Sequence, residues 1–195
     1  MSEALDLATE TLDAAAAAFA YHKLLADRAV AQLPDDALRQ ALDANTNSIA
    51  VVMKHVAGNL RSRWTDFLAS DGEKPDRDRD GEFVDDYASR DELLADWERG
   101  WGALHDTLAA LAPEDLGRTV TIRGEGFSVP AALARSLAHT AYHVGQIVQL
   151  ARHWAGDEWE TLTIPRGRSS QFNQQAWGAR AYGTIPGDQQ RQQQQ

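Results

Sequence analysis

The chain has 195 residues, of which 43% are apolar and 25% are charged, a composition that is typical of a globular protein and excludes wholesale disorder. Asp and Glu outnumber Lys and Arg by 29 to 19, and the net charge of -10 argues against binding to nucleic-acid phosphates. The chain has no cysteine, which excludes disulfides, iron–sulfur clusters and a protein thiol nucleophile, and leaves its six histidines as the softer metal ligands.

No segment of the sequence has the pattern of a signal peptide or a membrane span. The first residues are acidic where a signal peptide requires positive charge, and the apolar stretch at 14–21 is far shorter than the roughly 20 residues that cross a bilayer. We therefore expect a cytoplasmic protein that has neither a membrane nor a nucleic acid as partner.

The N-terminal part of the chain predicts two long helices. Apolar residues recur at intervals of three and four over residues 3–33 and form one buried stripe, and a proline follows this helix. A turn then leads into a short helix at 37–42. Asn47 or Ser48 caps the second long helix, whose periodicity fades near the turn-rich residues 70–72.

Two further helices follow a long crossover at 71–87. Ser89, with Glu92 three residues later, forms a capping-box pattern and predicts the start of the third helix. The fourth helix is expected to begin near Ser128 and to end near Gly156, where glycine suits a helix C-terminus.

The pattern as a whole predicts an all-α fold. Between the third and fourth helices, residues 119–123 alternate like a strand, but this stretch is too short to define a sheet. We expect an up-down four-helix bundle with one long crossover between its second and third helices. It forms a single domain over residues 1–180, followed by a disordered, glutamine-rich tail over residues 181–195.

The sharpest chemical signal is a pair of histidines in the fourth helix, His139 and His143. Residues four apart lie about 5–6 Å apart on one helix face, so the two imidazoles can bind one metal ion. A third ligand must then come from another helix, and His55, beside the apolar stripe of the second helix, is the best candidate. The alternative is that all three are ordinary core or boundary histidines, because such a pair also arises by chance.

The surroundings of the histidine pair limit the chemistry. The residue after His139 is Thr140 rather than glutamate, so the pair lacks the general base of a zinc peptidase. A metal ion held by three histidines has an open position, where it can polarise water or lower the pKa of a bound thiol. Since the protein has no cysteine, that thiol would belong to a substrate or to a small-molecule cosubstrate.

Four further residues are candidates for contacts with a substrate or with the ligands. Asn59 and Arg63 continue the face of the second helix that carries its histidine, and Gln146 lies one turn beyond the pair in the fourth helix. Arg63 could meet an anionic group. His22 lies on the stripe of the first helix and could face the same cavity; the alternative is a core-edge histidine bonded to a carbonyl.

Residues 76–87 mimic the calcium-binding loop of an EF-hand. Acidic residues occupy its first, third and fifth positions, and glycine occupies the sixth. The twelfth position, which requires a bidentate glutamate, is Tyr87, and the alternating arginines would repel a cation. We therefore interpret this segment as a solvated loop whose charges pair with one another.

Six segments together resemble the DinB/YfiT-like proteins, and more narrowly an uncharacterised bacterial branch of that superfamily. The resemblance extends over roughly residues 5–175, and the segment in the fourth helix is its most specific part. The segments are residues 47–50 (NSIA), 55–59 (HVAGN), 61–68 (RSRWTDFL), 71–75 (DGEKP), 137–147 (LAHTAYHVGQI) and 162–169 (LTIPRGRS).

The resemblance implies a four-helix bundle in which three histidines bind a divalent metal, usually zinc or nickel. The matching positions are His55, His139 and His143, the same three that the spacing suggests. Members are often homodimers. Characterised relatives include thiol-dependent transferases and a mycothiol-dependent isomerase, in which the metal activates the thiolate of a cosubstrate.

Three functional hypotheses follow. The first is a metal-dependent transferase or hydrolase that acts on a small molecule, with a thiol as cosubstrate. The second is a dimeric stress-response or interaction protein in which the metal only cross-links two helices. The third is a dimerising interaction protein that binds no metal. Activity transfers poorly within a fold, so the substrate does not follow from the resemblance.

Overall fold

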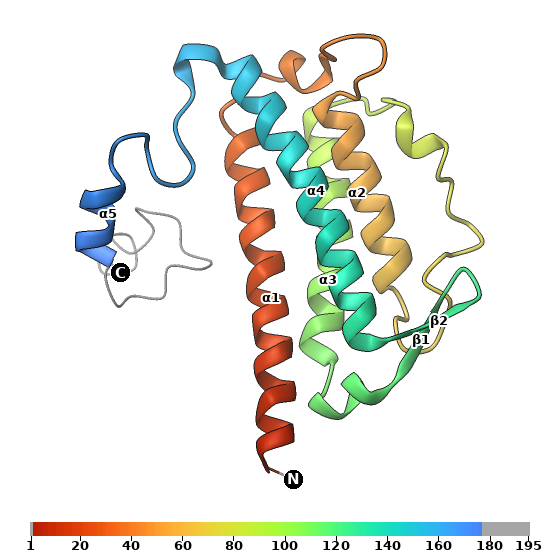
Figure 1. Cartoon of the computed structure of the whole chain (residues 1–195). Helices are drawn as coiled ribbons and strands as arrows, with labels where there is room; N and C mark the ends of the chain where they lie inside the picture. The colour runs from red at the N-terminus through yellow and green to blue at the C-terminus, as the bar shows by residue number, and fades with distance from the viewer. Residues whose placement is uncertain (1, 177–195) are drawn as a thin grey trace.

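A computed structural model describes residues 2–176 of the chain, which form helices and one small sheet (Figure 1). The tail predicted at 181–195 lies outside the described residues. Four long helices and one short helix are α1 (Ser2–Val30), α2 (Ile49–Trp64), α3 (Arg90–Ala110), α4 (Val129–Ala155) and α5 (Ser169–Ala176). Four single turns of 3-10 helix are η1 (Asp36–Arg39), η2 (Gly81–Phe83), η3 (Pro113–Gly117) and η4 (Gly156–Glu158). Among the described residues, no helix combines the length and the apolar character that crossing a membrane requires.

Serine side chains begin three of the long helices, as the sequence predicted. Ser48 Oγ accepts a hydrogen bond from the backbone N–H of Val51 at 3.3 Å, and Ser128 Oγ makes the corresponding bond at the start of α4. Ser89 Oγ accepts from the backbone N–H of Glu92 at 3.2 Å. At the other end of α4, Gly156 has a φ of +54°, a conformation in which glycine avoids the strain of a side chain.

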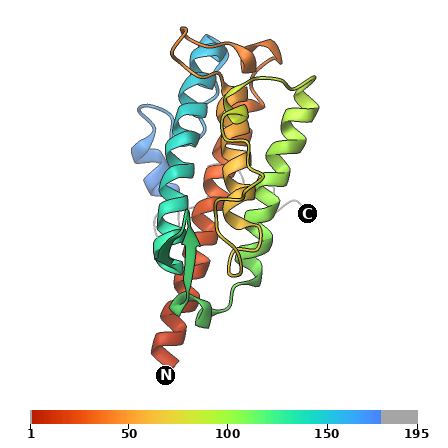
Figure 2. The same ribbon diagram turned by 90° about the vertical axis from the view of Figure 1, so that its right-hand side faces the viewer.

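The four long helices lie side by side, with α2 packed mainly on α3 and α1 packed mainly on α4 (Figure 1). The segment 65–89 returns the chain along the length of α2 before α3 begins, and Figure 2 looks onto this crossover. As a result α3 runs in the same direction as α2, and the up-down alternation is interrupted between these two helices. The crossover also covers one face of α2, and that face carries His55.

A β-hairpin joins α3 to α4, and this corrects the expectation that residues 119–123 do not define a sheet. The strands β1 (Thr119–Ile122) and β2 (Glu125–Ser128) pair antiparallel, with Ile122 opposite Glu125. The turn residues Arg123 and Gly124 have φ values of +56° and +76°, as a two-residue hairpin turn of type I′ requires. An Arg-Gly turn is a weaker sequence signal than Asn-Gly, which is why the second strand was missed.

Two other boundaries differ from the prediction. The helix expected at 37–42 is the single 3-10 turn η1, which ends at Arg39. Helix α2 ends at Trp64 rather than near residue 70, and Asp66 follows with a φ of +49°. The short helix α5 was not predicted. Apolar periodicity is decisive only over several helical turns, so it misplaces the end of α2 and does not identify elements as short as η1 and α5.

The core includes three fully buried tryptophans, Trp64, Trp97 and Trp101, which supports core packing as the role of these residues.

Helices α2 and α3 approach each other closely where Gly100 faces Ala57. A Cβ atom on Gly100 would lie 2.7 Å from the Cα of Ala57 and 2.8 Å from its carbonyl oxygen. Glycine is therefore required here by a close approach of two backbones.

We expect Gly100→Ala to lower the free energy of unfolding by about 1–3 kcal/mol, because the added methyl group forces α2 and α3 apart. The cost of this separation outweighs the higher helix propensity of alanine. Urea unfolding measures the change. Gly102→Ala on the same helix is the control: its Cβ would meet nothing within 4 Å, so it should stabilise the protein by up to about 1 kcal/mol. Equal stability of Gly100→Ala and wild type would contradict the close approach.

Candidate metal centre

Three histidines from two helices come together at one point in the structure. His55 lies in the middle of α2, and His139 and His143 lie one turn apart on α4. The Nε2 atoms of His55 and His139 are 3.3 Å apart, and one nitrogen from each of the three rings lies within 4.8 Å of the others. The three imidazoles are therefore close enough to bind a single metal ion. We call these three residues the histidine triad.

Two members of the triad are oriented by a hydrogen bond from the other ring nitrogen. His55 Nδ1 lies 2.9 Å from Glu82 Oε2, and His143 Nδ1 lies 2.7 Å from Gln146 Oε1. Both acceptors are oxygens, so each Nδ1 carries the proton and each Nε2 keeps its lone pair. Metal-binding histidines generally donate their second ring N–H to a carboxylate or carbonyl in this way, which fixes the tautomer and the ring orientation.

The carboxylate that orients His55 is itself held from the crossover. Arg77 donates to both oxygens of Glu82, from Nε at 2.7 Å and from a terminal nitrogen at 2.8 Å. Burial opposes ionisation of Glu82, but hydrogen bonds from His55 and Arg77 and the charge of Arg77 outweigh it, so the pKa of Glu82 is lowered. Glu82 therefore presents a full negative charge behind the His55 ring.

His139 is the least satisfied member of the triad. Since His55 Nε2 has only a lone pair, His139 donates its Nε2–H to it, and His139 Nδ1 is buried without a hydrogen-bond partner among the described residues. Burial, reinforced by the neighbouring imidazoles and by Arg77 and Arg63, lowers the pKa of His139 to about 3. Burial also lowers the pKa of His143. His139 and His143 are thus neutral imidazoles, the protonation state that metal binding requires, and a set of three imidazole donors suits zinc, nickel or copper.

A family model described as "Protein of unknown function (DUF1572)" matches residues 6–168 of the chain. The chain belongs to this family. No curated protein and no solved structure matches the chain. The DUF1572 match includes α1 to α4 and all three members of the triad, so the cluster lies within the part of the chain that defines the family.

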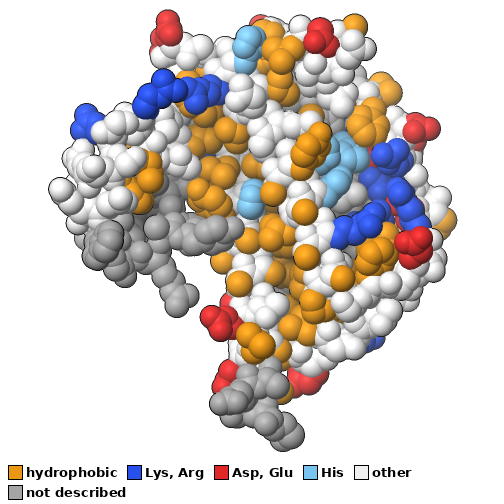
Figure 3. All heavy atoms as spheres, viewed as in Figure 1, with side chains coloured by type: hydrophobic (Ala, Val, Ile, Leu, Met, Phe, Trp, Pro, Cys, Tyr) orange, Lys and Arg blue, Asp and Glu red, His pale blue; other side chains and the backbone are white. Residues whose placement is uncertain are grey.

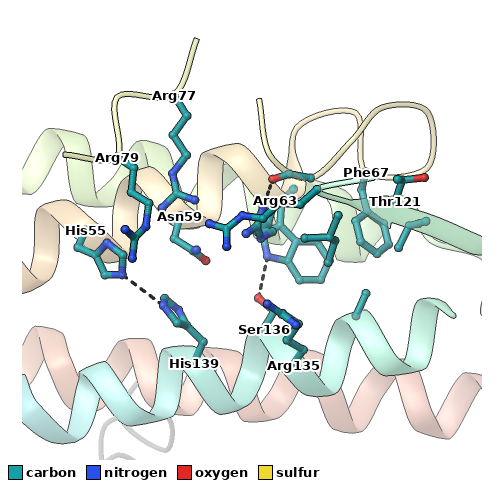
Figure 4. Close-up of a pocket in the computed structure, with 16 residues that line it drawn as sticks. His55, Asn59, Arg63, Phe67, Arg77, Arg79, Thr121, Arg135, Ser136 and His139 are labelled. Carbon is teal, nitrogen blue, oxygen red and sulfur yellow. Dashed lines mark hydrogen bonds between the residues drawn. The ribbon is translucent and has the colours of Figure 1, made fainter. Parts of the chain in front are cut away.

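The triad borders a cavity of about 180 Å³, and two of the four other predicted residues line it (Figure 4). Asn59 and Arg63 line the cavity together with His55 and His139. Gln146 does not line it but orients a member of the triad.

His22 is not brought to the site. Its Nδ1 lies 2.7 Å from the carbonyl oxygen of Ala18 in the same helix, which agrees with the alternative of a core-edge histidine bonded to a carbonyl. The apolar stripe of α1 packs mainly against α4 and lies away from the cavity, so its register with the other helices could not be read from periodicity alone.

Sequence reasoning missed two features of this site in the DUF1572 protein. One is Glu82, which belongs to the EF-hand-like segment 76–87. The other is the set of arginines around the cavity, two of which come from the same segment. The charges of this segment do pair with one another, as in Arg77 with Glu82, but the pair also supports His55. The alternation of acids and arginines was the available signal, and it was interpreted as a solvated loop whose charges pair only with one another.

The depressed pKa of His139 predicts a pH dependence of stability in the metal-free protein. Its folded pKa of about 3 lies below the ordinary 6.5, so the unfolded chain binds more protons between these values. Stability is therefore lost as the pH falls from 6.5, by about 1.4 kcal/mol per pH unit for each proton taken up on unfolding. Urea unfolding between pH 6.5 and 5 isolates this effect from the titration of carboxylates.

The control for this pH dependence is His139→Asn, which should reduce the slope by about one proton. An unchanged slope in that variant would show that the loss of stability arises from other groups.

Proposed function

We propose that this DUF1572 protein binds one divalent ion, zinc or nickel, through His55, His139 and His143, and that it is a metal-dependent transferase or hydrolase of a small molecule. The observation that carries the proposal is that the triad borders a cavity: two of its rings, those of His55 and His139, form part of the cavity wall. A purely structural metal site has no need of such a space.

The resemblance to DinB/YfiT-like proteins supports the same reading. In that superfamily, a four-helix bundle places one histidine of the second helix and two of the fourth around a divalent metal. The side-by-side packing of α1 to α4 and the positions of the triad are compatible with that arrangement. The thiol cosubstrate of the characterised relatives is the basis for proposing a small-molecule thiol here.

A zinc or nickel ion in the triad would supply a Lewis acid that polarises a bound group or lowers the pKa of water or of a thiol. The protein residues have separate roles. Glu82 and Gln146 fix two of the rings with Nε2 available for the metal. Trp64 and Phe67 give the cavity an apolar wall that limits access of water, and Asn59 offers an amide that can orient a polar group.

The alternative is a metal that only joins α2 to α4 in a dimeric stress-response or interaction protein. The observation in its favour is that the triad spans two helices, so a bound ion would cross-link them. The homodimer is proposed from the resemblance alone, and light scattering of the purified protein tests it.

Elemental analysis followed by cobalt substitution tests the proposal. We expect one divalent ion per chain, removable by a chelator, and a new near-ultraviolet absorption when 2-mercaptoethanol is added to the cobalt-loaded protein, because an open position admits the thiolate. Absence of a bound ion would overturn the proposal. If an ion is bound but the spectrum of the cobalt-loaded protein does not change when the thiol is added, the structural alternative is favoured.

A further inference from the structure

The cavity beside the triad has a charge opposite to that of the protein. The chain carries a net charge of -10, yet no aspartate or glutamate of the described residues lines this cavity, whereas five arginines do. Figure 3 shows blue arginine side chains directly beside the pale blue histidines on this face. The five arginines are Arg63, Arg77, Arg79, Arg123 and Arg135. We call them the arginine cluster.

Two carboxylates behind the cavity wall partly neutralise three members of the arginine cluster. Glu73 accepts from Arg63 at 3.0 Å, from Arg77 at 3.2 Å and from Arg123 at 3.1 Å. Glu82 takes the remaining donors of Arg77. One carboxylate is thus shared by three guanidinium groups, and a positive potential remains at the cavity surface.

The other two members have no carboxylate partner among the described residues. Arg79 lies over the ring of Phe83, with 5.7 Å from the guanidinium carbon to the ring centroid, and Arg135 lies over the ring of Phe127 at 5.3 Å. Both side chains are exposed at the cavity. The aromatic rings hold the two guanidinium groups in place without satisfying their N–H donors, which remain available to a ligand.

Burial and the charges of Arg77 and Arg123 lower the pKa of Arg63, although Glu73 acts in the opposite direction. Burial is the largest of these causes, so the lowered pKa reflects the enclosed position of the Arg63 guanidinium group.

The arginines occupy fixed positions relative to the triad. Arg135 precedes His139 by one turn of α4, and Arg63 follows His55 by two turns of α2, with Asn59 between them. At 1.5 Å per residue, the two arginines lie about 6 and 12 Å along their helices from the histidines. Figure 4 shows Arg79 reaching from the crossover toward the same side of the cavity as His55. Apolar side chains, including Trp64, Val120 and Ile122, line another part of the cavity.

We infer that the cavity binds a small molecule with a doubly charged oxyanion group, a phosphate monoester or a pair of carboxylates, attached to an apolar body. The anion lies between Arg79 and Arg135, at the end of the cavity that the triad borders (Figure 4), and the apolar body faces Trp64, Val120 and Ile122. That this molecule is the substrate rests on the proposed function. That it binds does not, because the arginine cluster needs no metal.

Calorimetric titration of the full chain at low salt tests the inference. Chelator-treated and metal-loaded protein are each titrated with inorganic phosphate, succinate and acetate. We expect the two dianions to bind at least about 10-fold more tightly than acetate in both forms. The dianion that binds more tightly identifies the class of ligand. Tighter binding of phosphate indicates a phosphate monoester, and tighter binding of succinate indicates a dicarboxylate.

Variants connect the binding to the arginine cluster. Arg79→Gln and Arg135→Gln should each weaken binding of the tighter dianion by about 5- to 30-fold, since each removes one charged hydrogen-bonding group from an exposed position. The control is Arg152→Gln, an exposed arginine on α4 that does not line the cavity, which should leave binding unchanged.

Two results would overturn the inference: equal affinities for acetate and the dianions, or binding that both cavity variants leave unchanged. The inference would also be overturned if dianion binding is lost when the metal is removed and is unchanged in the two arginine variants, because the anion would then bind the metal ion directly. If the proposed function is wrong, the chain takes up no divalent ion. Dianions would still bind in that case, and Arg79→Gln would still weaken their binding.

Discussion

His139→Asn is expected to lower the affinity for zinc or nickel by at least about 100-fold and to remove the increase in stability that the metal gives. Structural zinc sites with four ligands bind with about 10–16 kcal/mol, so each ligand contributes about 3 kcal/mol, a factor of about 100 in affinity. The triad has only three imidazoles within reach of one another, so no further histidine replaces a lost ligand. Competition with a chromophoric chelator measures the affinity.

The same substitution should leave the metal-free protein about as stable as wild type, or more stable. His139 Nδ1 is buried without a hydrogen-bond partner among the described residues, and three imidazole rings crowd one point, so the site costs stability when no cation is bound. An ordinary core histidine would behave in the opposite way, and its loss would destabilise the metal-free fold by about 1–3 kcal/mol. Urea unfolding in the presence of a chelator separates the two cases.

His153→Asn provides the matched control, because His153 lies on the same helix and is exposed. It should bind metal with wild-type affinity. Retention of full metal affinity by His139→Asn would contradict the triad as the metal site, and a fall in both variants would indicate a general effect on α4.

The helical fold and the pair His139 and His143 could be predicted from the sequence because both depend on short-range periodicity. The spacing of His139 and His143 fixes their mutual distance as soon as the segment is helical. His55 could be proposed only as the best candidate, because the position of α2 against α4 depends on packing between residues 84 apart in the chain. The place of His55 beside the apolar stripe of the second helix suggested it, and the resemblance to a known superfamily then supported that part of the prediction.

The crossover could not be predicted in the same way. Residues 65–89 have no sustained period, and their path depends on contacts with distant elements, such as the hydrogen bonds from the backbone N–H groups of Arg123 and Gly124 to Asp71 at 2.8 Å. Charged residues in such a segment normally face solvent. Here the path of the chain turns Arg77 and Glu82 inward, which gives the triad an orienting carboxylate and gives the cavity part of its arginine cluster.

The inward-facing carboxylate of Glu82 leads to the second prediction of a large effect on metal affinity, that of the substitution Glu82→Gln. We expect this substitution to weaken metal binding by about 10- to 100-fold while all three ligands remain, as is usual when the partner behind a metal-binding histidine is changed. The amide can still accept a hydrogen bond from His55, but the negative charge that makes the ring a better donor to a cation is lost, and Arg77 keeps only Glu73 as an anionic partner. Competition with a chelator again provides the measurement.

Gly58→Ala perturbs the same carboxylate without changing any charge. Gly58 lies on α2, three residues after His55, and a Cβ atom there would overlap Oε1 of Glu82, which Arg77 and His55 hold in place. The methyl group must therefore displace the carboxylate from the His55 ring, and we expect a loss of metal affinity of about 10-fold, the lower limit for Glu82→Gln.

Gly145→Ala on the ligand helix α4 should have no effect on metal affinity, since its Cβ would meet nothing within 4 Å. If Glu82→Gln and Gly58→Ala both bind metal as tightly as wild type, packing alone orients His55. If both weaken it while Gly145→Ala does not, the carboxylate from the crossover is part of the metal centre, and the folding of an irregular 25-residue segment determines how well two helices hold a cation.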